Sequence, residues 1–459
     1  MNLEPREVLF FAMKKVDFRE GTVFSNLIQT ATPMLIAQVL HLLYNIVDRV
    51  YIGRIPNAGT DALGAVGLCF PIILIITGFT NMYGMGGSPL FSMELGRGDP
   101  EKAAQIQNTA FRLLTVTALI ITVVGECFAT PLLRLFGAGN AELPTALSYF
   151  LYYLPGTLFA MVSTGMNPYI TGQGFSMVAM ISVAAGAVAN LLLDPIFIFV
   201  FGMGVKGAAI ATVLSQLLSA VIIMRFLLGP QNEFRIRFSL SFPYALQIIS
   251  LGISPFIMQA TNSLVQIVCN NVLMQTGGAR FVSIMTIISS VRSILDVPVM
   301  ALGEGASPII SFNYGARKGK KVIETIRLML TMAIPYTFIV WLLIQIIPGA
   351  FISIFSNDPL LRGDAIHALH LYFFAFIFQS LQYGGQTTFK ALNKKKQTIF
   401  FSLFRKVIMV VPLTILLPLV FGMGTDGVFI AEPVSNFVGG TACFTTMLLT
   451  ILPELKTME

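Results

Sequence analysis

The chain has 459 residues, of which 55% are hydrophobic and only 11% are charged, and its mean hydropathy is +0.79. This composition is typical of an integral membrane protein and excludes an ordinary soluble domain. The net charge of +7 does not indicate nucleic-acid binding, because membrane topology and anionic lipid already explain an excess of Lys and Arg in such a chain.

Twelve apolar stretches are each long enough to cross the hydrocarbon core, which takes roughly 20 helical residues. They are 24–50, 62–92, 109–133, 144–168, 177–201, 207–228, 245–275, 281–313, 323–347, 364–389, 399–420 and 427–452. The hydrophilic stretches between them leave little room for a soluble domain. The sequence contains no GxxxxGK[ST] phosphate-binding loop and no HExxH pattern. We therefore predict an all-α integral membrane protein that is not an enzyme and that ATP does not drive directly.

The distribution of Lys and Arg predicts the orientation in the membrane. If the N-terminus lies in the cytoplasm, most of the 29 Lys and Arg residues, including Arg405 and Lys406, fall on the inner flanks of the spans. The exceptions are Arg49, Arg54, Arg134, Lys206, Arg280, Arg292 and Arg362. We expect a multi-pass protein of a bacterial-type plasma membrane with both termini in the cytoplasm. The first residues lack a basic–apolar–AxA cleavage pattern, so no cleaved signal peptide is expected.

The chain repeats itself once, at an offset of 219 to 220 residues. The stretch GMGGSP at 84–89 recurs as GEGASP at 303–308, and FGMGVKG at 201–207 recurs as FGMGTDG at 421–427. Because six crossings return each copy to the side on which it began, the copies are parallel repeats. We predict two pseudo-symmetric six-helix lobes, 1–228 and 245–459, joined by a cytoplasmic linker at 229–244. A merely structural duplication is the alternative to the two halves of a transporter.

Polar residues interrupt two apolar spans of the first copy. Asp48 lies near the outer end of the first span, and Asn190 and Asp194 lie four residues apart on one face of the fifth. Pro195 follows and leaves a carbonyl of the preceding turn without its helical donor. Because acids are costly in hydrocarbon, we expect these three side chains to converge with Thr212, at the outer start of the sixth span, on a site for Na⁺ or a shared proton. The alternative is that a neighbouring helix satisfies each polar group separately.

Other polar residues are candidates for contact with a substrate. Asp296 lies near the middle of the eighth span, with Arg292 one turn before it and Met300 one turn after it. Asp296 is interpreted either as the counter-charge of a cationic substrate or as the partner of Arg292 in an internal ion pair. Gln259 of the seventh span and Tyr44 of the first complete the set of substrate-contacting candidates.

Three further acids lie within predicted spans. Glu304 lies in the Gly-rich break of the eighth span, and Glu126 and Glu432 lie toward the outer ends of theirs. We interpret Glu126 and Glu432 as snorkelling toward the interface and rank all three below Asp296.

Four stretches resemble the multidrug and toxic compound extrusion (MATE) transporters, in particular the MepA-like bacterial branch. They are Asn45–Gly53 (NIVDRVYIG), Asn190–Pro195 (NLLLDP), Gly202–Thr212 (GMGVKGAAIAT) and Gly305–Ala316 (GASPIISFNYGA). The resemblance covers essentially the whole chain and rests on the order and spacing of these motifs. It implies an antiporter that expels organic cations and other amphipathic drugs in exchange for sodium ions or protons by alternating access. We further expect a monomer in the lipid bilayer, with no cofactor apart from a bound Na⁺ if sodium drives transport, and no nucleic-acid partner.

The resemblance also implies roles for single residues. The residues of this chain that match the N-lobe cation site of the family are Asp48, Asn190, Asp194 and Thr212. Asp296 resembles the acidic position that the family uses in substrate handling. Some relatives carry an acid in the seventh span, where this chain has amides, so a second cation site of that type is not expected.

Two other functions fit the sequence less well. A flippase for lipid-linked precursors has the same two-lobe plan, but its cavity would be rich in Arg and Lys, whereas the intramembrane charges here are expected to be mostly acidic. A channel or receptor would need a symmetric filter or repeated pore ring, and the two copies differ at their acids.

Overall fold

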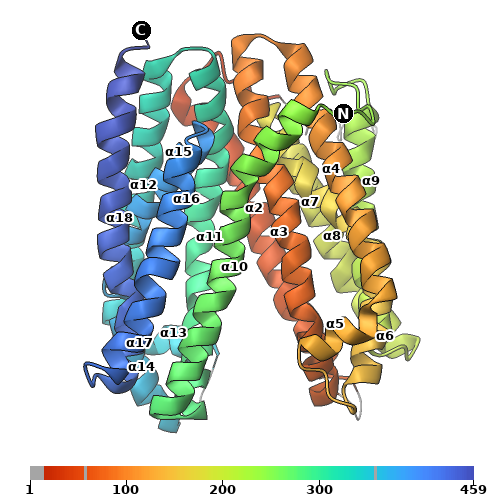
Figure 1. Cartoon of the computed structure of the whole chain (residues 1–459), viewed down its shortest axis with the longest axis vertical. Coiled ribbons are helices and arrows are strands. Elements are labelled where there is room, and N and C mark those ends of the chain that lie inside the picture. Colours follow the sequence, from red (N-terminus) through yellow and green to blue (C-terminus); the bar gives the residue numbers. More distant parts are fainter. Residues whose placement is uncertain (1–14, 56–58, 356–358, 459) are drawn as a thin grey trace, which may run out of the picture. The chain divides into compact units, whose positions relative to one another are not determined.

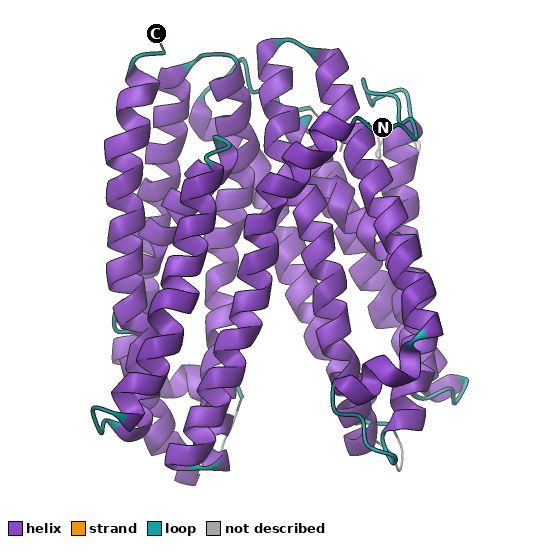
Figure 2. Cartoon of the chain, viewed as in Figure 1, coloured by secondary structure: helices purple, strands orange, loops and turns teal. Residues whose placement is uncertain are grey.

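The computed structural model describes residues 15–55, 59–355 and 359–458, and all regular secondary structure within these ranges is helical (Figure 1, Figure 2). The Lys and Arg residues before position 15, which contributed to the predicted orientation, lie outside the described residues.

Long helices dominate the first copy of the repeat. They are α2 (Val23–Gly53), α3 (Gly59–Arg97), α4 (Pro100–Cys127), α6 (Leu143–Tyr153), α7 (Thr157–Gly172), α8 (Ser176–Pro195) and α9 (Val205–Leu228). The short helix α5 (Ala129–Leu135) precedes α6, a 3-10 turn joins α6 to α7, and a π-helical turn (Ile196–Val200) extends α8. Pro195 lies at this change of helix type, as expected of a residue that cannot donate to the preceding turn.

The second copy follows the same plan. Its helices are α10 (Phe242–Gly277), α11 (Ala279–Gly315), α12 (Gly319–Ile346), α13 (Pro348–Ser353), α14 (Pro359–Phe373), α15 (Ile377–Ala391), α16 (Lys395–Leu403), α17 (Val411–Leu419) and α18 (Gly424–Lys456). A π-helical segment (Phe404–Val410) joins α16 to α17 into one continuous crossing.

Eleven helical segments of the described chain are long and apolar enough to cross a membrane. They correspond to every predicted span except the tenth, 364–389, which the structure divides between α14 and α15, 15 residues each. Between these helices the backbone bonds tighten to a three-residue spacing, as in the 3.0 Å bond from Phe376 N–H to Phe373 O. The all-α membrane fold is confirmed, but the tenth crossing consists of two short helices and not of one.

The described helices group into two compact units. Thr32–Phe256 form most of the N-terminal unit, and Ile257–Glu459 form most of the C-terminal unit. The first residues of α2, in the segment Gly21–Ala31, belong to the C-terminal unit, and the first residues of α10, up to Phe256, belong to the N-terminal unit. The predicted lobes 1–228 and 245–459 assign all of α2 to the first lobe and α10 from residue 245 onward to the second, so they differ from the two compact units at both helix starts.

Glycines of the repeated GMGGSP stretch explain these assignments. A Cβ on Gly86 of α3 would lie 2.6 Å from the carbonyl oxygen of Ile248 in α10, and a Cβ on Gly252 of α10 would overlap a carbonyl of α3. In the second copy, a Cβ on Gly305 of α11 would lie 2.7 Å from Cα of Ala31 in α2. The repeated motif is therefore a close helix crossing in both units, possible because glycine has no side chain.

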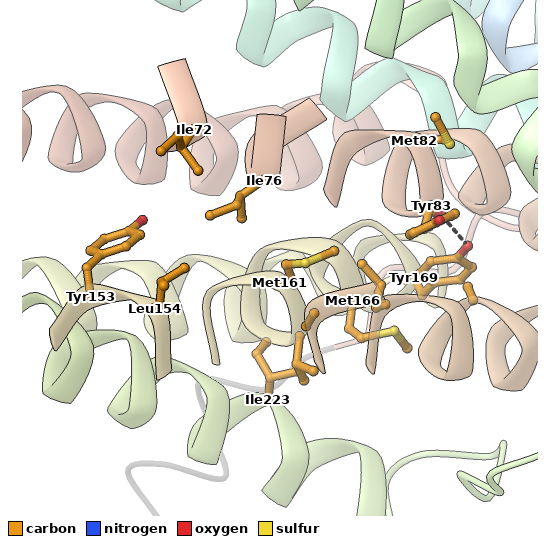
Figure 3. Packing of buried hydrophobic residues seen from close by; sticks show 14 of the residues in the cluster. Ile72, Ile76, Met82, Tyr83, Tyr153, Leu154, Met161, Met166, Tyr169 and Ile223 are labelled. Carbon is orange, nitrogen blue, oxygen red and sulfur yellow. Dashed lines mark hydrogen bonds between the residues drawn. The ribbon is translucent and has the colours of Figure 1, made fainter. Parts of the chain in front are cut away.

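The core of the N-terminal unit lies between α3 and α7 (Figure 3). The hydroxyl of the fully buried Tyr169 donates a hydrogen bond to the Tyr83 carbonyl at 2.8 Å, and Gly87 leaves the space that this hydroxyl fills. The buried side chains of this core include Ile72, Ile76, Met161 and Met166. Because α8 and α9 both pack on α7, this core positions the polar residues of the fifth span.

Candidate functional site

Helices α2 and α8 bring two acids together in the N-terminal unit. Asn190 and Asp194 share one face of α8, are only 2% and 0% exposed, and are joined by a hydrogen bond from Asn190 Nδ2 to Asp194 Oδ1 at 3.2 Å. The carboxyl group of Asp48, in the last turns of α2, lies close enough to that of Asp194 for each to act on the other electrostatically. The structure therefore places three of the four predicted ion-site residues side by side.

Three oxygens of this cluster are buried acceptors without a donor among the described residues. They are Asp48 Oδ1, Asp194 Oδ2 and Asn190 Oδ1. The guanidinium of the neighbouring Arg49 lies over the Phe70 ring, 5.6 Å from its centroid. Buried acceptors are costly when they are unpaired, and two adjacent carboxylates repel when both are ionised. The arrangement is chemically suited to one added proton or one small cation held by hard oxygen ligands.

Thr212 is not part of this hydrogen-bonded group. It is half-buried on α9 and makes no hydrogen bond to either carboxylate among the described residues. Tyr44 lies close enough to Asp48 and Asp194 for their charges to act on it, but its hydroxyl contacts His41 Nε2, at 3.5 Å. Neither side chain contributes a direct bond to the two acids in this conformation.

Two tyrosines of α6 belong to the surroundings of the acids and were missed by the sequence analysis. Tyr149 and Tyr153 are buried and stacked, with ring centroids 5.8 Å apart. Both lie close enough to Asp48 to interact electrostatically with its carboxyl group. Their spacing of four residues predicts only that the two side chains share one face of a helix. It does not indicate which other helix that face contacts, so the sequence did not connect them with α2.

The C-terminal unit holds a second buried polar cluster, around Asp296 of α11. Arg292 Nε donates to Asp296 Oδ2 at 3.3 Å, and Gln379 Nε2 of α15 donates to Asp296 Oδ1 at 2.7 Å. Arg292 also donates to the Tyr372 hydroxyl at 2.7 Å. Both carboxylate oxygens of Asp296 thus have protein partners, which is the geometry of the internal ion pair and not of a free counter-charge.

Glu432 of α18 corrects two expectations. It was predicted to snorkel toward the interface, but it is 3% exposed, and its Oε1 accepts hydrogen bonds from Arg292 at 2.6 Å, Arg405 at 2.9 Å and Lys406 at 3.0 Å. Arg405 and Lys406 were predicted on an inner flank, whereas the structure places them in the π-helical segment inside the eleventh crossing. The expectation that intramembrane charges are mostly acidic is therefore wrong for this unit.

A cavity of about 310 Å³ adjoins this cluster, and Asp296 contributes to its wall. The other substrate candidates lie elsewhere: Gln259 and Met300 do not line the cavity, and Tyr44 belongs to the N-terminal unit. The structure thus does not gather the predicted substrate residues into one site. The described residues also contain no group of three or more His, Cys, Asp or Glu side chains placed to hold a metal ion.

Comparison with known protein families decides the class of the chain. The model of the MatE family matches residues 33–196 and 255–416, that is, both copies of the repeat. The chain belongs to the MatE family. As a MatE protein it is a membrane transport protein and not an enzyme, and the flippase alternative is not favoured.

Curated relatives of this MatE protein include the multidrug export proteins MepA of two staphylococci. The chain is 24% identical to that of Staphylococcus haemolyticus over 347 residues, covering 74% of this chain and 75% of the relative. It is 22% identical to that of Staphylococcus aureus over 412 residues, covering 88% and 90%.

Solved MATE structures have the same fold. A crystal structure of a MATE protein in a bent conformation superimposes with a TM-score of 0.89 at 23% identity, covering 96% of this chain and 98% of that one. A MOP-superfamily transporter from Pyrococcus furiosus superimposes with a TM-score of 0.88, also at 23% identity, covering 96% and 99%. At this identity the likeness establishes the fold alone.

Proposed function

We propose that this MatE protein is a multidrug exporter that exchanges organic cations and other amphipathic drugs for sodium ions or protons. The drug substrates are inferred from its MepA relatives. These are multidrug export proteins, and they match this chain over most of its length. The coupling site is inferred from the paired carboxyl groups of Asp48 and Asp194. That pairing, with its unpartnered buried oxygens, is the observation that carries the proposal.

The two acids couple ion and drug movement through conformation. An ion or proton neutralises the repulsion between the carboxylates, and it stabilises whichever conformation holds the two acids together. Export follows if the drug binds better to the other conformation, because coupling between two ligands is reciprocal. Pro33, inside α2, is the point at which we propose that this helix bends when the ion binds.

The remaining assignments belong to the same proposal. The protein works as a monomer in a bacterial-type plasma membrane, with both termini in the cytoplasm and no cofactor other than the coupling ion. Thr212 joins the ion ligands when the site is occupied, and Asp296, Met300, Gln259 and Tyr44, which this conformation does not gather into one site, contact the substrate at other stages of transport.

Drug transport into inverted membrane vesicles tests the coupling site. In Asp194→Asn, one of the two charges is lost while the volume is kept, so ion-driven export should fall by about tenfold or more. The matched control is Asp364→Asn, which removes a partly exposed acid paired with Arg280 at 2.7 Å and should export like the wild type. Full ion-driven export by Asp194→Asn would refute the assignment.

A further inference from the structure

The cavity of the C-terminal unit has an unbalanced charge. Five ionisable side chains of opposite signs line it: Arg292, Arg405 and Lys406 are basic, and Asp296 and Glu432 are acidic. At their ordinary charges, three basic and two acidic side chains leave one positive charge in excess. An uncompensated charge inside a protein is costly, so the arrangement favours a guest that brings one negative charge.

Three of the four carboxylate oxygens in the cavity wall accept hydrogen bonds from protein side chains, and the basic groups retain N–H donors. Both oxygens of Asp296 are hydrogen-bonded, and one oxygen of Glu432 accepts from all three basic side chains. An ammonium group has three N–H donors, and that of Lys406 makes one hydrogen bond among the described residues, to Glu432. The cavity can therefore donate to an anion more readily than it can accept from a cation.

A neutral side chain in the same wall also lacks a partner. Gln382 of α15 is 6% exposed, lines the cavity, and has a buried Oε1 without a hydrogen-bond partner. The O and N atoms of a glutamine amide exchange places by rotation of the amide, so Gln382 can turn its NH₂ toward a guest that accepts hydrogen bonds.

The rest of the lining sets the size and polarity of the guest. Met258, Val265 and Phe401 contribute apolar surface to the cavity, whose volume of about 310 Å³ lies at the lower end of small-molecule pockets. The space fits the acidic end of a compact amphipathic molecule.

We propose that this cavity is a binding subsite for a singly charged carboxylate carried on a small apolar or aromatic body. The inference goes beyond the proposed function, because it assigns to this transporter a class of guest that organic cations do not represent. The carboxylate lies against Lys406 and Arg405, Gln382 donates to it, and the apolar body contacts the Met258 and Phe401 side of the wall.

The test measures binding of tritiated 2-naphthoate to the purified full-length protein in detergent, without any ion gradient. Unlabelled 2-naphthoate should displace the probe at a concentration about tenfold or more below that of 2-naphthamide, its neutral isostere, because only the acid supplies the missing charge. Since no transport is measured, failure here is distinguishable from failure of the export assay.

Two variants and one control locate the site. Lys406→Gln removes the excess charge, and Gln382→Glu cancels it with a built-in carboxylate. Each should weaken 2-naphthoate binding by about tenfold or more.

The control is Lys396→Gln, which replaces an exposed lysine of the same crossing and should bind like the wild type. Gln382→Glu retains every cation of the cluster, so it tests the site even if Lys406→Gln fails to fold. Equal displacement by acid and amide, or wild-type affinity in Gln382→Glu, would overturn the proposal.

Discussion

At Glu432, one carboxylate oxygen accepts hydrogen bonds from three basic side chains. Replacing this acid by glutamine leaves three buried cations with Asp296 as their remaining acidic neighbour in the cluster. Removing one partner of a buried ion pair typically costs about 3–5 kcal/mol. Glu432→Gln should therefore lower the free energy of unfolding by about that amount, measured by SDS titration in mixed micelles.

The control for this variant is Glu454→Gln near the end of α18. Glu454 is paired with Lys394 at 2.6 Å, but both side chains are partly exposed, at 33% and 24%. An ion pair near solvent is worth about 1 kcal/mol or less. If both variants lost similar free energy of unfolding, the buried ion pairs of Glu432 would contribute no more to stability than a partly exposed pair does.

Asn190 should affect the affinity for the coupling ion more than the maximal rate. Asn190→Ala removes both the hydrogen bond to Asp194 and an unpartnered oxygen beside it. If sodium drives export, the sodium concentration for half-maximal export should rise by about tenfold, because an oxygen ligand beside Asp194 is lost. If protons drive export, the half-maximal proton concentration should instead fall, because Asn190 Nδ2 no longer stabilises the ionised Asp194 carboxylate. Ser182→Ala, which removes a hydroxyl bonded to the backbone of the same helix, is the control. An unchanged half-maximal concentration in Asn190→Ala would contradict a role of Asn190 in the site.

The sequence predicted contacts between side chains that share one helix face. It did not predict contacts between side chains that are far apart in the chain. The spacing of Asn190 and Asp194 was enough to place them together, and the cost of an acid in hydrocarbon was enough to select Asp48. The three-way contact of Glu432 could not be predicted, because α11, the π-helical segment and α18 are far apart in the chain.

At the scale of elements, the crossing of α3 and α10 depends on glycine. A methyl group at Gly252 would overlap the Met82 carbonyl of α3, so Gly252→Ala should force the helices apart. Overpacking of this kind typically costs about 1–3 kcal/mol. The expected result is a lower melting temperature in detergent.

Gly363→Ala in α14 is the matched control, because a Cβ at that position meets nothing within 4 Å. Alanine favours a helix over glycine, so this variant should be as stable as the wild type or more stable. A Gly252→Ala protein with an unchanged melting temperature would contradict the close crossing.

Helices were predictable from hydropathy, but their interruptions were only partly so. Pro195 marked the change to a π-helical turn after α8. The break between α14 and α15 carries no Pro or Gly, since its residues are Phe374, Ala375 and Phe376. Nothing in the local sequence distinguishes this stretch from a continuous apolar helix.

At the scale of the whole molecule, the internal repeat predicted two halves, and both copies match the MatE family. The repeat did not reveal that α2 and α10 each begin in the opposite compact unit. Sequence similarity between copies records which segments correspond to each other. It carries no information about which half a helix start packs against.

The central claim is that the paired acids of α2 and α8 couple drug export to an ion. Its most direct test is drug export from proteoliposomes under an imposed sodium gradient and, separately, an imposed pH gradient. One of the two gradients should accelerate export by the wild type, and Asp48→Asn should respond to neither. Export by Asp48→Asn that follows the same gradient as the wild type would contradict the claim.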